Sequence, residues 1–468
     1  MSHPQILSLQ VTEALLNQAR ATQFQFGAGT ALVAVQHMLL QTVDLFEIAG
    51  AMGLNLKNIF ALGKVYSNSP PVIEILRDRG VTVIESTTPK PGAFDYSFER
   101  DVKRLWQVTT EALAQRNIKR ILVLDDDGVC ITNTPPEVLR QYAICGVEQT
   151  SQGMFLFEEQ PPPFPVISWA RSAVKLQIGG PIFSHCFIDK LNSEFLCGRS
   201  IEGKQLGIIG MGSIGRALAK LAVRQGIKVL FYDPAPDVHI PASLQGIITR
   251  TPCLEELMLT SDYVAGCSGR NPFKDRWPLN HRPGIKLFSV STGDQEFSPI
   301  IDDLKARPDF AVDPNTWAIT SEQGPSGPIE IGYLGYPYTF VSRAPEAVPT
   351  QIVQLESGGL LAALVQARIY LQVCETYPTY NSGVRRISPK AQRFVYETWL
   401  ETMKQQGINL WETFDYDTEL LSAAHDEDWL SQHTEPAEDE RDEIDRTVEE
   451  RMAEFVCLDC AVKARVEE

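Results

Sequence analysis

The sequence predicts an α/β protein with two doubly wound parallel-sheet domains and a helical C-terminal extension. Two observations support this prediction. Short apolar runs alternate with helical patterns through the first half of the chain, and the same alternation resumes after about residue 195. The chain has 468 residues, 44% of them hydrophobic, which is enough to bury roughly two or three cores. We therefore expect residues 1–194 to form one α/β domain and residues 195–350 to form a second.

In the first domain each apolar run precedes a helix-like pattern, as the crossovers of a parallel sheet require. The pairs are ALVAVQ with QTVDLFEIAGAMGL, NIFALG with PPVIEILRDRG, VTVIES with DVKRLWQVTTEALAQRN, and RILVLDDDG with TPPEVLRQYAICG; FPVISWA closes the series. A long apolar helix over about residues 351–378 is expected to return to this domain and complete it.

The second domain contains a glycine-rich turn between a strand and a helix, in residues 204–234, KQLGIIGMGSIGRALAKLAVRQGIKVLFYDP. Gly210 permits a tight turn, Gly212 has no side chain to block a pyrophosphate, and Gly215 lets helix and strand pack closely. Ser213 and Ile214 begin the helix, whose free N–H groups would face the phosphates. The pattern therefore predicts a dinucleotide-binding Rossmann domain.

The acid at the end of the second strand predicts which dinucleotide binds. Asp233 follows Val229, Leu230 and Phe231 and can accept hydrogen bonds from both ribose hydroxyls. Its charge would repel a 2′-phosphate, and no arginine follows in residues 234–236. The predicted cofactor is NAD rather than NADP. Further strands are expected at YVAGCS, IKLFSVST and DFAVDP.

Charge and composition exclude several classes of partner. The chain carries 42 basic and 59 acidic residues, a net charge of −17, and residues 426–468 hold sixteen of the acids but only five of the bases. Because there is no basic run, neither nucleic acid nor an anionic membrane is expected as a partner. A small-molecule substrate is expected instead.

The sequence also predicts where the protein is located. The N-terminus has no signal pattern, and the apolar stretch from Gly358 to Val373 is interrupted by Gln366 and Arg368, so we expect a cytoplasmic protein. The nine cysteines are scattered, and the single CxxC, Cys457 to Cys460, is interpreted as chance spacing, so no metal site is predicted.

Residues 379–468 are expected to form a mostly helical, acidic extension. Ile444, Val448, Met452 and Phe455 recur every three or four residues and give one apolar stripe on a helix. The stripe fits either packing against its own domain or contact with a second copy of the chain in a homo-oligomer.

Two families share the glycine turn. D-2-hydroxyacid dehydrogenases need an Arg after the strand IKLFSVST and a His paired with an acid further on. This chain has Thr292 at the Arg position and no His between His281 and His425. That family therefore fits the turn but not the expected catalytic residues.

The second family is suggested by motifs in the N-terminal half. ALVAVQHMLLQTVDLFEIAGAMGLNLKNIF, ILVLDDDGVCITN, GVEQTSQG and FPVISWARSAVK occur in this order before the glycine turn. Together they resemble S-adenosylhomocysteine hydrolase over residues 28 to 372. The resemblance implies an NAD domain inserted into a substrate domain, and a bound NAD that oxidises the substrate's ribose.

This resemblance also implies roles for particular residues. His37, Asp126 and Lys175 match the family's catalytic His, Asp and Lys, which handle protons. Thr150 and Ser151 fall in the motif that lies at the family's cofactor.

Several family positions differ. Gln149 replaces a ribose-binding Glu, Gly179 and Gly180 replace an Asp-Asn pair, and Leu39 and Gln41 replace the residues that bind adenine. The family's Gly-His-Pro reads Gly-Tyr-Pro at residues 335–337.

Three functional hypotheses follow. The first is a divergent enzyme that uses bound NAD to oxidise an alcohol, such as a nucleoside-type substrate, with His37, Asp126 and Lys175 as proton-handling groups. The second is a catalytically silent NAD-bound protein that acts through binding or assembly. The third is a true hydrolase whose substrate-binding residues are rearranged.

Overall fold

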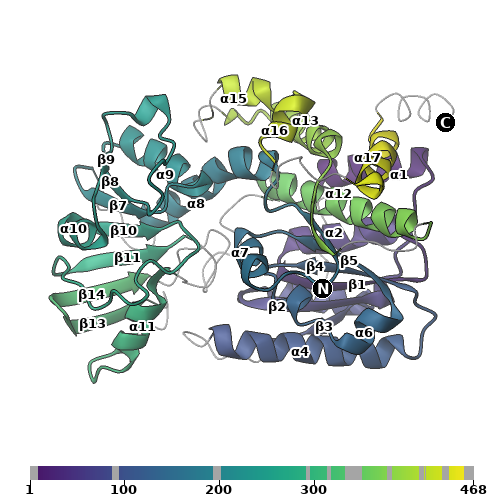
Figure 1. Cartoon of the computed structure of the whole chain (residues 1–468), viewed down its shortest axis with the longest axis horizontal. Coiled ribbons are helices and arrows are strands. Elements are labelled where there is room, and N and C mark those ends of the chain that lie inside the picture. Colours follow the sequence, from purple (N-terminus) through teal and green to yellow (C-terminus); the bar gives the residue numbers. More distant parts are fainter. Residues whose placement is uncertain are drawn as a thin grey trace. The chain divides into compact units, whose positions relative to one another are not determined.

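The computed structural model describes residues 9–86, 94–192, 202–290, 296–313, 318–332, 350–376, 382–410, 416, 418–434 and 442–457 (Figure 1). The chain divides into two compact units, the first comprising Met1–Leu176 and Pro349–Glu468, the second Gln177–Val348. Each unit is an α/β domain, and the C-terminal residues add helices, so the predicted fold class is confirmed. The boundaries predicted from the sequence stay a prediction.

The first unit is built on a seven-stranded parallel sheet in the order β15-β6-β5-β4-β1-β2-β3. Its strands are β1 (Thr30–Met38), β2 (Ile59–Asn68), β3 (Thr82–Ile84), β4 (Arg120–Asp125), β5 (Ala143–Glu148), β6 (Pro165–Ser168) and β15 (Gly383–Arg386). Every residue of β1 is buried, as expected for a central strand covered on both faces.

Helices cover both faces of this sheet. They are α1 (Gln10–Ala21), α2 (Leu40–Ala51), α3 (Pro70–Asp78), α4 (Phe94–Leu113), α5 (Val129–Thr132), α6 (Pro136–Gln141), α7 (Ser151–Glu159), α12 (Thr350–Cys374), α13 (Pro389–Gln405), α15 (Thr418–Ala423), α16 (Glu427–Gln432) and α17 (Glu443–Phe455). Figure 1 shows α12 and α4 on opposite faces of the sheet. The chain passes from β1 to β2 and β3 on one side and then to β4 on the other, so the strand order reverses between β1 and β4.

The apolar helix α12 is the predicted returning helix. It packs on β4, β5 and β6 and against α1, α2, α13 and α17. Val353–Cys374 is long and apolar enough to cross a membrane, but 94% of its most apolar window is buried inside the protein, as in the central helix of a domain core.

The second unit contains an eight-stranded sheet in the order β12-β13-β14-β11-β10-β7-β8-β9. Its strands are β7 (Gln205–Ile209), β8 (Lys228–Tyr232), β9 (Thr249–Arg250), β10 (Tyr263–Gly266), β11 (Ile285–Ser289), β12 (Ala311–Val312), β13 (Ile319–Gly324) and β14 (Gly327–Gly332). Its helices are α8 (Gly180–Lys190), α9 (Ser213–Arg224), α10 (Leu254–Thr260) and α11 (Ser298–Lys305). The strand order reverses between β7 and β10, and the glycine turn follows β7.

Two features of the sheets differ from the sequence prediction. The strand expected at DFAVDP is described only through residue 313 and gives the short strand β12, which pairs antiparallel with β13. β13 forms a hairpin with β14 that was not predicted from the sequence. In the extension, β15 adds a parallel strand next to β6. The GVRR of β15 has no apolar alternation, so its pairing depends on tertiary contacts rather than on local sequence.

The apolar stripe of the extension is buried within the first unit. Ile444, Val448, Met452 and Phe455 are 0–6% exposed, and α17 packs on α12 and α13. This packing explains the stripe without a second copy of the chain, and homo-oligomer formation stays a prediction.

Candidate functional site

The turn between β7 and α9 in the second unit has the backbone that the three glycines predict. Gly210 has φ +92°, a conformation that only glycine adopts readily. A Cβ on Gly215 would lie 2.0 Å from the Gly210 carbonyl oxygen, so helix and turn could not pack as they do. A Cβ on Gly212 would meet nothing within 4 Å. The space in front of the helix is therefore open at the position where a pyrophosphate would approach.

The first turn of α9 has no side-chain cap. Gly212 is the N-cap residue and has no side chain, so no capping group lies between the start of the helix and an approaching anion. Gly180, at the start of α8, packs against this turn, and a Cβ there would lie 2.7 Å from Ser213 Oγ. Glycine at residue 180 is therefore explained by close packing of α8 on α9.

Asp233 lies just beyond β8 and is held by two backbone groups. Its Oδ2 accepts from Met211 N at 2.7 Å, and its Oδ1 accepts from Ala235 N at 2.9 Å. Each carboxylate oxygen keeps a further lone pair for a ribose hydroxyl. The same carboxylate thus joins the glycine turn to the predicted ribose site.

The structure also brings an arginine to this loop that the sequence argument did not include. Arg250, on β9, donates from Nη2 to the carbonyls of Asp233 and Ala235 and from Nη1 to the carbonyl of Pro236. Its guanidinium is therefore engaged by backbone carbonyls next to the acid. Arg250 lies 17 residues after Asp233 in the sequence. The contact can therefore be predicted only when the parallel pairing of β8 with β9 is known.

In the first unit, a buried polar cluster lies at the carboxyl ends of the strands where the strand order reverses, the usual place for a site in such sheets. His37, near the end of β1, has its Nε2 3.2 Å from Asp126 Oδ2, directly after β4. Its Nδ1 lies 2.5 Å from the hydroxyl of Ser67, on β2. If Nε2 donates to the carboxylate, Nδ1 accepts from Ser67, and the imidazole is fixed in one tautomer. Two predicted residues, His37 and Asp126, are thus in contact.

A buried lysine compensates the acids of this cluster. Lys64, which is fully buried on β2, lies 3.1 Å from Asp126 Oδ1 and also pairs with Asp127. Burial opposes the charge on both partners, but the attraction between them dominates. Lys64 and His37 hold the pKa of Asp126 below its usual range, and Asp126 and Asp127 raise the pKa of Lys64.

The neighbouring carboxyl groups have raised pKa values, in contrast to Asp126. Burial raises the pKa of Asp127 to about 7 and that of Asp125 to about 6, and it raises the pKa of Glu148 well above its ordinary value. Asp127 Oδ1 and Glu148 Oε2 are buried without a hydrogen-bond partner. Asp127 also has φ +89°, an unusual conformation for a side-chain-bearing residue. Strained backbone and perturbed acids together are typical of functional sites.

Gln149 belongs to the same cluster. Its Nε2 donates to Asp126 Oδ2, and its Oε1 accepts from Gln36 at 2.8 Å. The amide therefore supports the carboxylate that contacts His37.

Lys175 is held by a residue of α12. Its Nζ lies 2.9 Å from Glu356 Oε2, which also accepts from Trp169 Nε1 at 2.7 Å. The predicted catalytic lysine is therefore part of an ion pair, with 20% of its side chain exposed.

Thr150 and Ser151, predicted at the cofactor, lie at the start of α7. The Thr150 hydroxyl donates to Glu148 Oε1 at 2.6 Å and accepts from the N–H groups of Asp127 and Gly153. One donor and two acceptor positions exhaust a hydroxyl. A cofactor contact from Thr150 would have to replace one of these bonds.

Sequence analysis missed Lys64 and Ser67. A lone Lys or Ser in a strand gives no signal by itself, although both lie on β2, the strand next to β1. Thr292, Cys460 and residues 335–337 lie outside the described residues. Within the described ranges no cluster of His, Cys, Asp and Glu could hold a metal ion.

Comparison with known families identifies the glycine turn. Residues 187–272 match the model of the D-isomer specific 2-hydroxyacid dehydrogenase, NAD binding domain. The match includes β7, α9, β8 and Asp233. The cofactor of this domain is NAD. The second unit thus contains an NAD-binding domain of the oxidoreductase type.

Curated relatives cover parts of the chain. An uncharacterized protein of Mycobacterium tuberculosis is 28% identical over 274 residues, which is 58% of this chain and 52% of that protein. A hydroxypyruvate reductase of Thermotoga maritima is 33% identical over 97 residues, 20% of this chain and 26% of that enzyme. A D-lactate dehydrogenase of Curvularia clavata is 47% identical over 45 residues, 10% of this chain and 13% of that enzyme. At most, the chain spans about half the length of the curated relatives it matches.

Solved structures are similar only at a low level. The NAD+-bound 3-phosphoglycerate dehydrogenase of Entamoeba histolytica is 13% identical with a TM-score of 0.34, covering 76% of this chain and 99% of that one. A D-2-hydroxyisocaproate dehydrogenase is 11% identical with a TM-score of 0.31, covering 75% and 98%. Similarity at this level says nothing about the site.

The predicted resemblance to S-adenosylhomocysteine hydrolase is wrong, because the matching family is that of the 2-hydroxyacid dehydrogenases. The motifs behind the resemblance are short strand ends and turns that any parallel sheet with polar groups at its carboxyl edge can contain. The roles that this resemblance gave to Lys175, Thr150 and Ser151 lose that support. The geometry of His37 and Asp126 does not depend on it.

Proposed function

We propose that the protein is an NAD-dependent oxidoreductase that interconverts a small alcohol and its carbonyl form. The observation that carries this proposal is the glycine turn with Asp233, where the open space at Gly212 and a helix start without a side-chain cap suit a dinucleotide. The match to an NAD-binding domain of 2-hydroxyacid dehydrogenases supports the same chemistry.

The second unit would hold NAD through three groups. The start of α9 would bind the pyrophosphate, Gly212 would leave room for it, and Asp233 would accept hydrogen bonds from the ribose hydroxyls. When bound, NAD supplies a hydride acceptor for the alcohol carbon. Asp233 sets the preference for NAD, because its charge disfavours a 2′-phosphate.

Oxidation of an alcohol also needs a group that takes the hydroxyl proton. Within the first unit, His37 has the chemistry for this role, because Nδ1 can accept a proton through Ser67 while Asp126 stabilises the resulting imidazolium. Lys64 and Gln149 keep Asp126 ionised and oriented. Asp126 is thus a positioning residue in this proposal.

A second function, binding of NAD without turnover, is favoured by one observation. The positions at which 2-hydroxyacid dehydrogenases carry their Arg and His have no equivalent here, since Thr292 replaces the Arg and no His occurs between His281 and His425. In that case the bound dinucleotide would serve structure or assembly.

A turnover assay separates the two functions. Purified protein is incubated with NAD and a panel containing D-lactate, D-glycerate and simple alcohols, and with reduced NAD and hydroxypyruvate or pyruvate. We expect reduced NAD to form or disappear with at least one pair. Gly212→Ala should lower this activity tenfold or more at NAD concentrations below the Kd, because cofactor binding is weakened. His37→Gln should keep cofactor binding and lower the rate about 10²- to 10⁴-fold. Stoichiometric NAD binding with no redox change in any reaction would favour the second function.

A further inference from the structure

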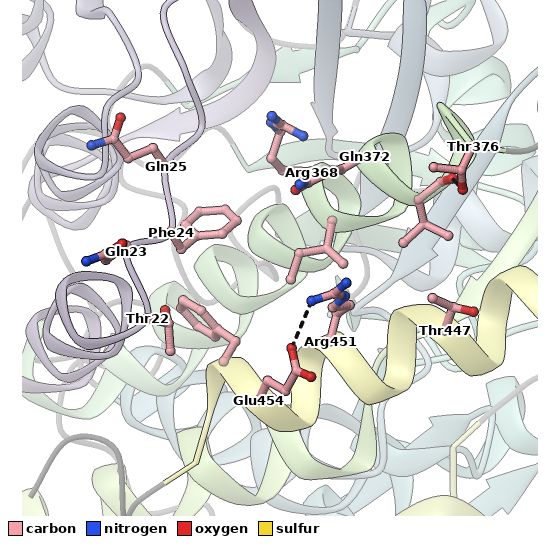
Figure 2. Close-up of a pocket in the computed structure, with 13 residues that line it drawn as sticks. Thr22, Gln23, Phe24, Gln25, Arg368, Gln372, Thr376, Thr447, Arg451 and Glu454 are labelled. Atoms are coloured by element: carbon pink, nitrogen blue, oxygen red, sulfur yellow. Dashed lines mark hydrogen bonds and ion pairs between the residues drawn. The ribbon is translucent and has the colours of Figure 1, made fainter. Parts of the chain in front are cut away.

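A cavity of about 560 Å³ lies in the first unit at the opposite end of the sheet from His37. It is bounded by the turn Thr22–Gln25, which precedes β1, and by α12 and α17 (Figure 2). His37 lies at the carboxyl end of β1, whereas this turn leads into its amino end. Cavities of this size hold small organic ligands. The cavity is therefore a second candidate site, separate from the polar cluster.

The floor of the cavity is apolar. Phe24 and Phe455 meet edge to face with ring centroids 5.4 Å apart, and Ile369 and Val373 are 6% and 8% exposed. Figure 2 shows Phe24 projecting between the turn and α12. Such a floor suits the apolar body or ring of a ligand.

Arg368 is a cation of the cavity that forms no close ion pair with the described residues. Arg368, on α12, donates from Nε to the Phe26 carbonyl at 2.9 Å, and its Nη1 is buried without a hydrogen-bond partner. Among the residues that the structure describes, Arg368 forms no ion pair within 4.0 Å. Burial lowers the pKa of Arg368 and the nearby Arg120 lowers it further, while Glu375 opposes both effects. The guanidinium is therefore a partly desolvated charge that an anion would stabilise.

The other charges near the cavity cancel in pairs. Arg120 is paired with Glu375, its Nε lying 2.7 Å from Oε1. Arg451 and Glu454, one turn apart on α17, are paired at 3.2 Å, as the dashed line in Figure 2 marks. The positive charge of Arg368 is left as the net charge of this set.

The rim provides neutral donors. Gln23, Gln25 and Gln372 are exposed, and their side-chain amides have no partner among the described residues. The hydroxyls of Thr22 and Thr376 instead donate to carbonyls of their own helices, at 2.7 Å in both cases. The amides are thus the neutral groups able to donate to a ligand at the mouth of the cavity.

We propose that this cavity binds a small organic carboxylate with an apolar body, its carboxylate at Arg368 and the rim amides, its body on Phe24 and Phe455. The proposal does not depend on the proposed oxidoreductase function, because every residue of the cavity lies in the first unit and none belongs to the NAD site.

The test uses phenylacetate, which has an aromatic body, a carboxylate and no hydroxyl or carbonyl that an oxidoreductase could convert. Isothermal titration calorimetry of the full-length protein with phenylacetate is compared with its neutral analogue phenylacetamide. We expect phenylacetate to bind with a Kd at least tenfold lower than that of phenylacetamide. Gly212→Ala protein, impaired at the NAD site, should bind phenylacetate as the wild type does.

Two exposed residues of α17 carry opposite charges, so removing each charge should change the affinity for phenylacetate in opposite directions. Arg451→Gln removes a positive charge and should weaken phenylacetate binding roughly threefold, whereas Glu454→Gln removes a negative charge and should strengthen it by a similar factor. Arg446→Gln and Glu450→Gln make the same charge changes at exposed positions of α17 that do not line the cavity, and should leave the Kd unchanged. Arg368→Met should weaken binding tenfold or more, with its fold checked by circular dichroism.

Several results would overturn the proposal. They are equal affinity for phenylacetate and phenylacetamide, or no phenylacetate binding at millimolar concentration. Shifts of the Kd in the same direction for Arg451→Gln and Glu454→Gln would also overturn it, as would shifts of the same size in the control variants Arg446→Gln and Glu450→Gln. Each would show that Arg368 and the cavity charge do not select an anion.

Discussion

His37 Nε2 lies 3.2 Å from Asp126 Oδ2, and the two residues follow β1 and β4, the strands between which the order of the first sheet reverses. Lys64 approaches the other oxygen of the same carboxylate at 3.1 Å. A carboxylate that pairs with Lys64 and contacts His37 stays ionised although it is fully buried. The stability of this cluster therefore depends on Lys64.

Replacing Lys64 with Met should strongly destabilise the first unit. The change leaves Asp126 and Asp127 buried without their cation, which costs about 3–5 kcal/mol of unfolding free energy at neutral pH. The deficit should shrink as the pH falls and the acids become protonated. Urea unfolding at several pH values measures both effects. The control is Lys119→Met, which removes a lysine at an exposed position and should change the free energy of unfolding by less than about 0.5 kcal/mol. A tolerated Lys64→Met at pH 7 would show that the cluster is not ionic.

Two glycines of the turn should separate folding from cofactor binding. A Cβ at Gly215 overlaps the Gly210 carbonyl, so Gly215→Ala should lower the thermal stability of the second unit even without cofactor. A Cβ at Gly212 meets nothing, so Gly212→Ala should leave that stability unchanged and weaken NAD binding by tenfold or more, because the methyl group enters the space meant for pyrophosphate. Thermal scans with and without NAD distinguish the variants. Equal NAD affinity of Gly212→Ala and wild type would contradict this assignment of the site.

Asp233 should determine cofactor choice. Wild-type protein is expected to bind NAD and not NADP, and Asp233→Ala should weaken NAD by about 1–3 kcal/mol through loss of the charged ribose acceptor. The variant should also lose the contact to Met211 N that supports the turn. Calorimetric titration with both cofactors measures the preference, and equal affinity of the wild type for NAD and NADP would rule this role out.

Asp44 should make stability fall as the pH rises. Its carboxylate accepts from Thr12 Oγ1 at 2.6 Å and from Leu9 N, and burial raises its pKa from 3.8 to about 6. The folded state therefore binds this proton more tightly than the unfolded state, so the stabilisation is full below about pH 4 and is lost by about pH 6. The loss is about 3 kcal/mol for a shift of about two pKa units. Asp44→Asn should remove this part of the slope between pH 4 and pH 6 in urea unfolding. An unchanged slope would show that Asp44 titrates normally.

Local sequence was sufficient to predict the NAD-binding turn of the second unit. The strand, glycine turn, helix and acid of residues 204–234 are consecutive, and each glycine has a steric reason that a single chain segment reveals. The hairpin of β13 and β14 and the edge strand β15 were not predicted, because their pairing is decided by neighbours distant in sequence.

The polar cluster was predictable only in part. His37 and Asp126 stand at strand ends, where polar residues of parallel sheets gather, so their contact follows from the strand order. Lys64 and Ser67 come from the adjacent strand and are recognised only when the register of β1 and β2 is known. The family resemblance failed because such strand-end motifs occur in unrelated parallel sheets, whereas the glycine turn belongs to the matched domain.

Transfer of deuterium from labelled reduced NAD tests the central claim most directly. The protein is incubated with reduced NAD carrying deuterium at the transferred position and with hydroxypyruvate, pyruvate and simple ketones, and the products are analysed by mass spectrometry. An oxidoreductase places carbon-bound deuterium in the alcohol product, and Gly212→Ala protein should form at least tenfold less of it at limiting reduced NAD. If the wild type binds reduced NAD stoichiometrically but no product carries deuterium, the protein holds its dinucleotide without turning it over, and the proposed function is contradicted.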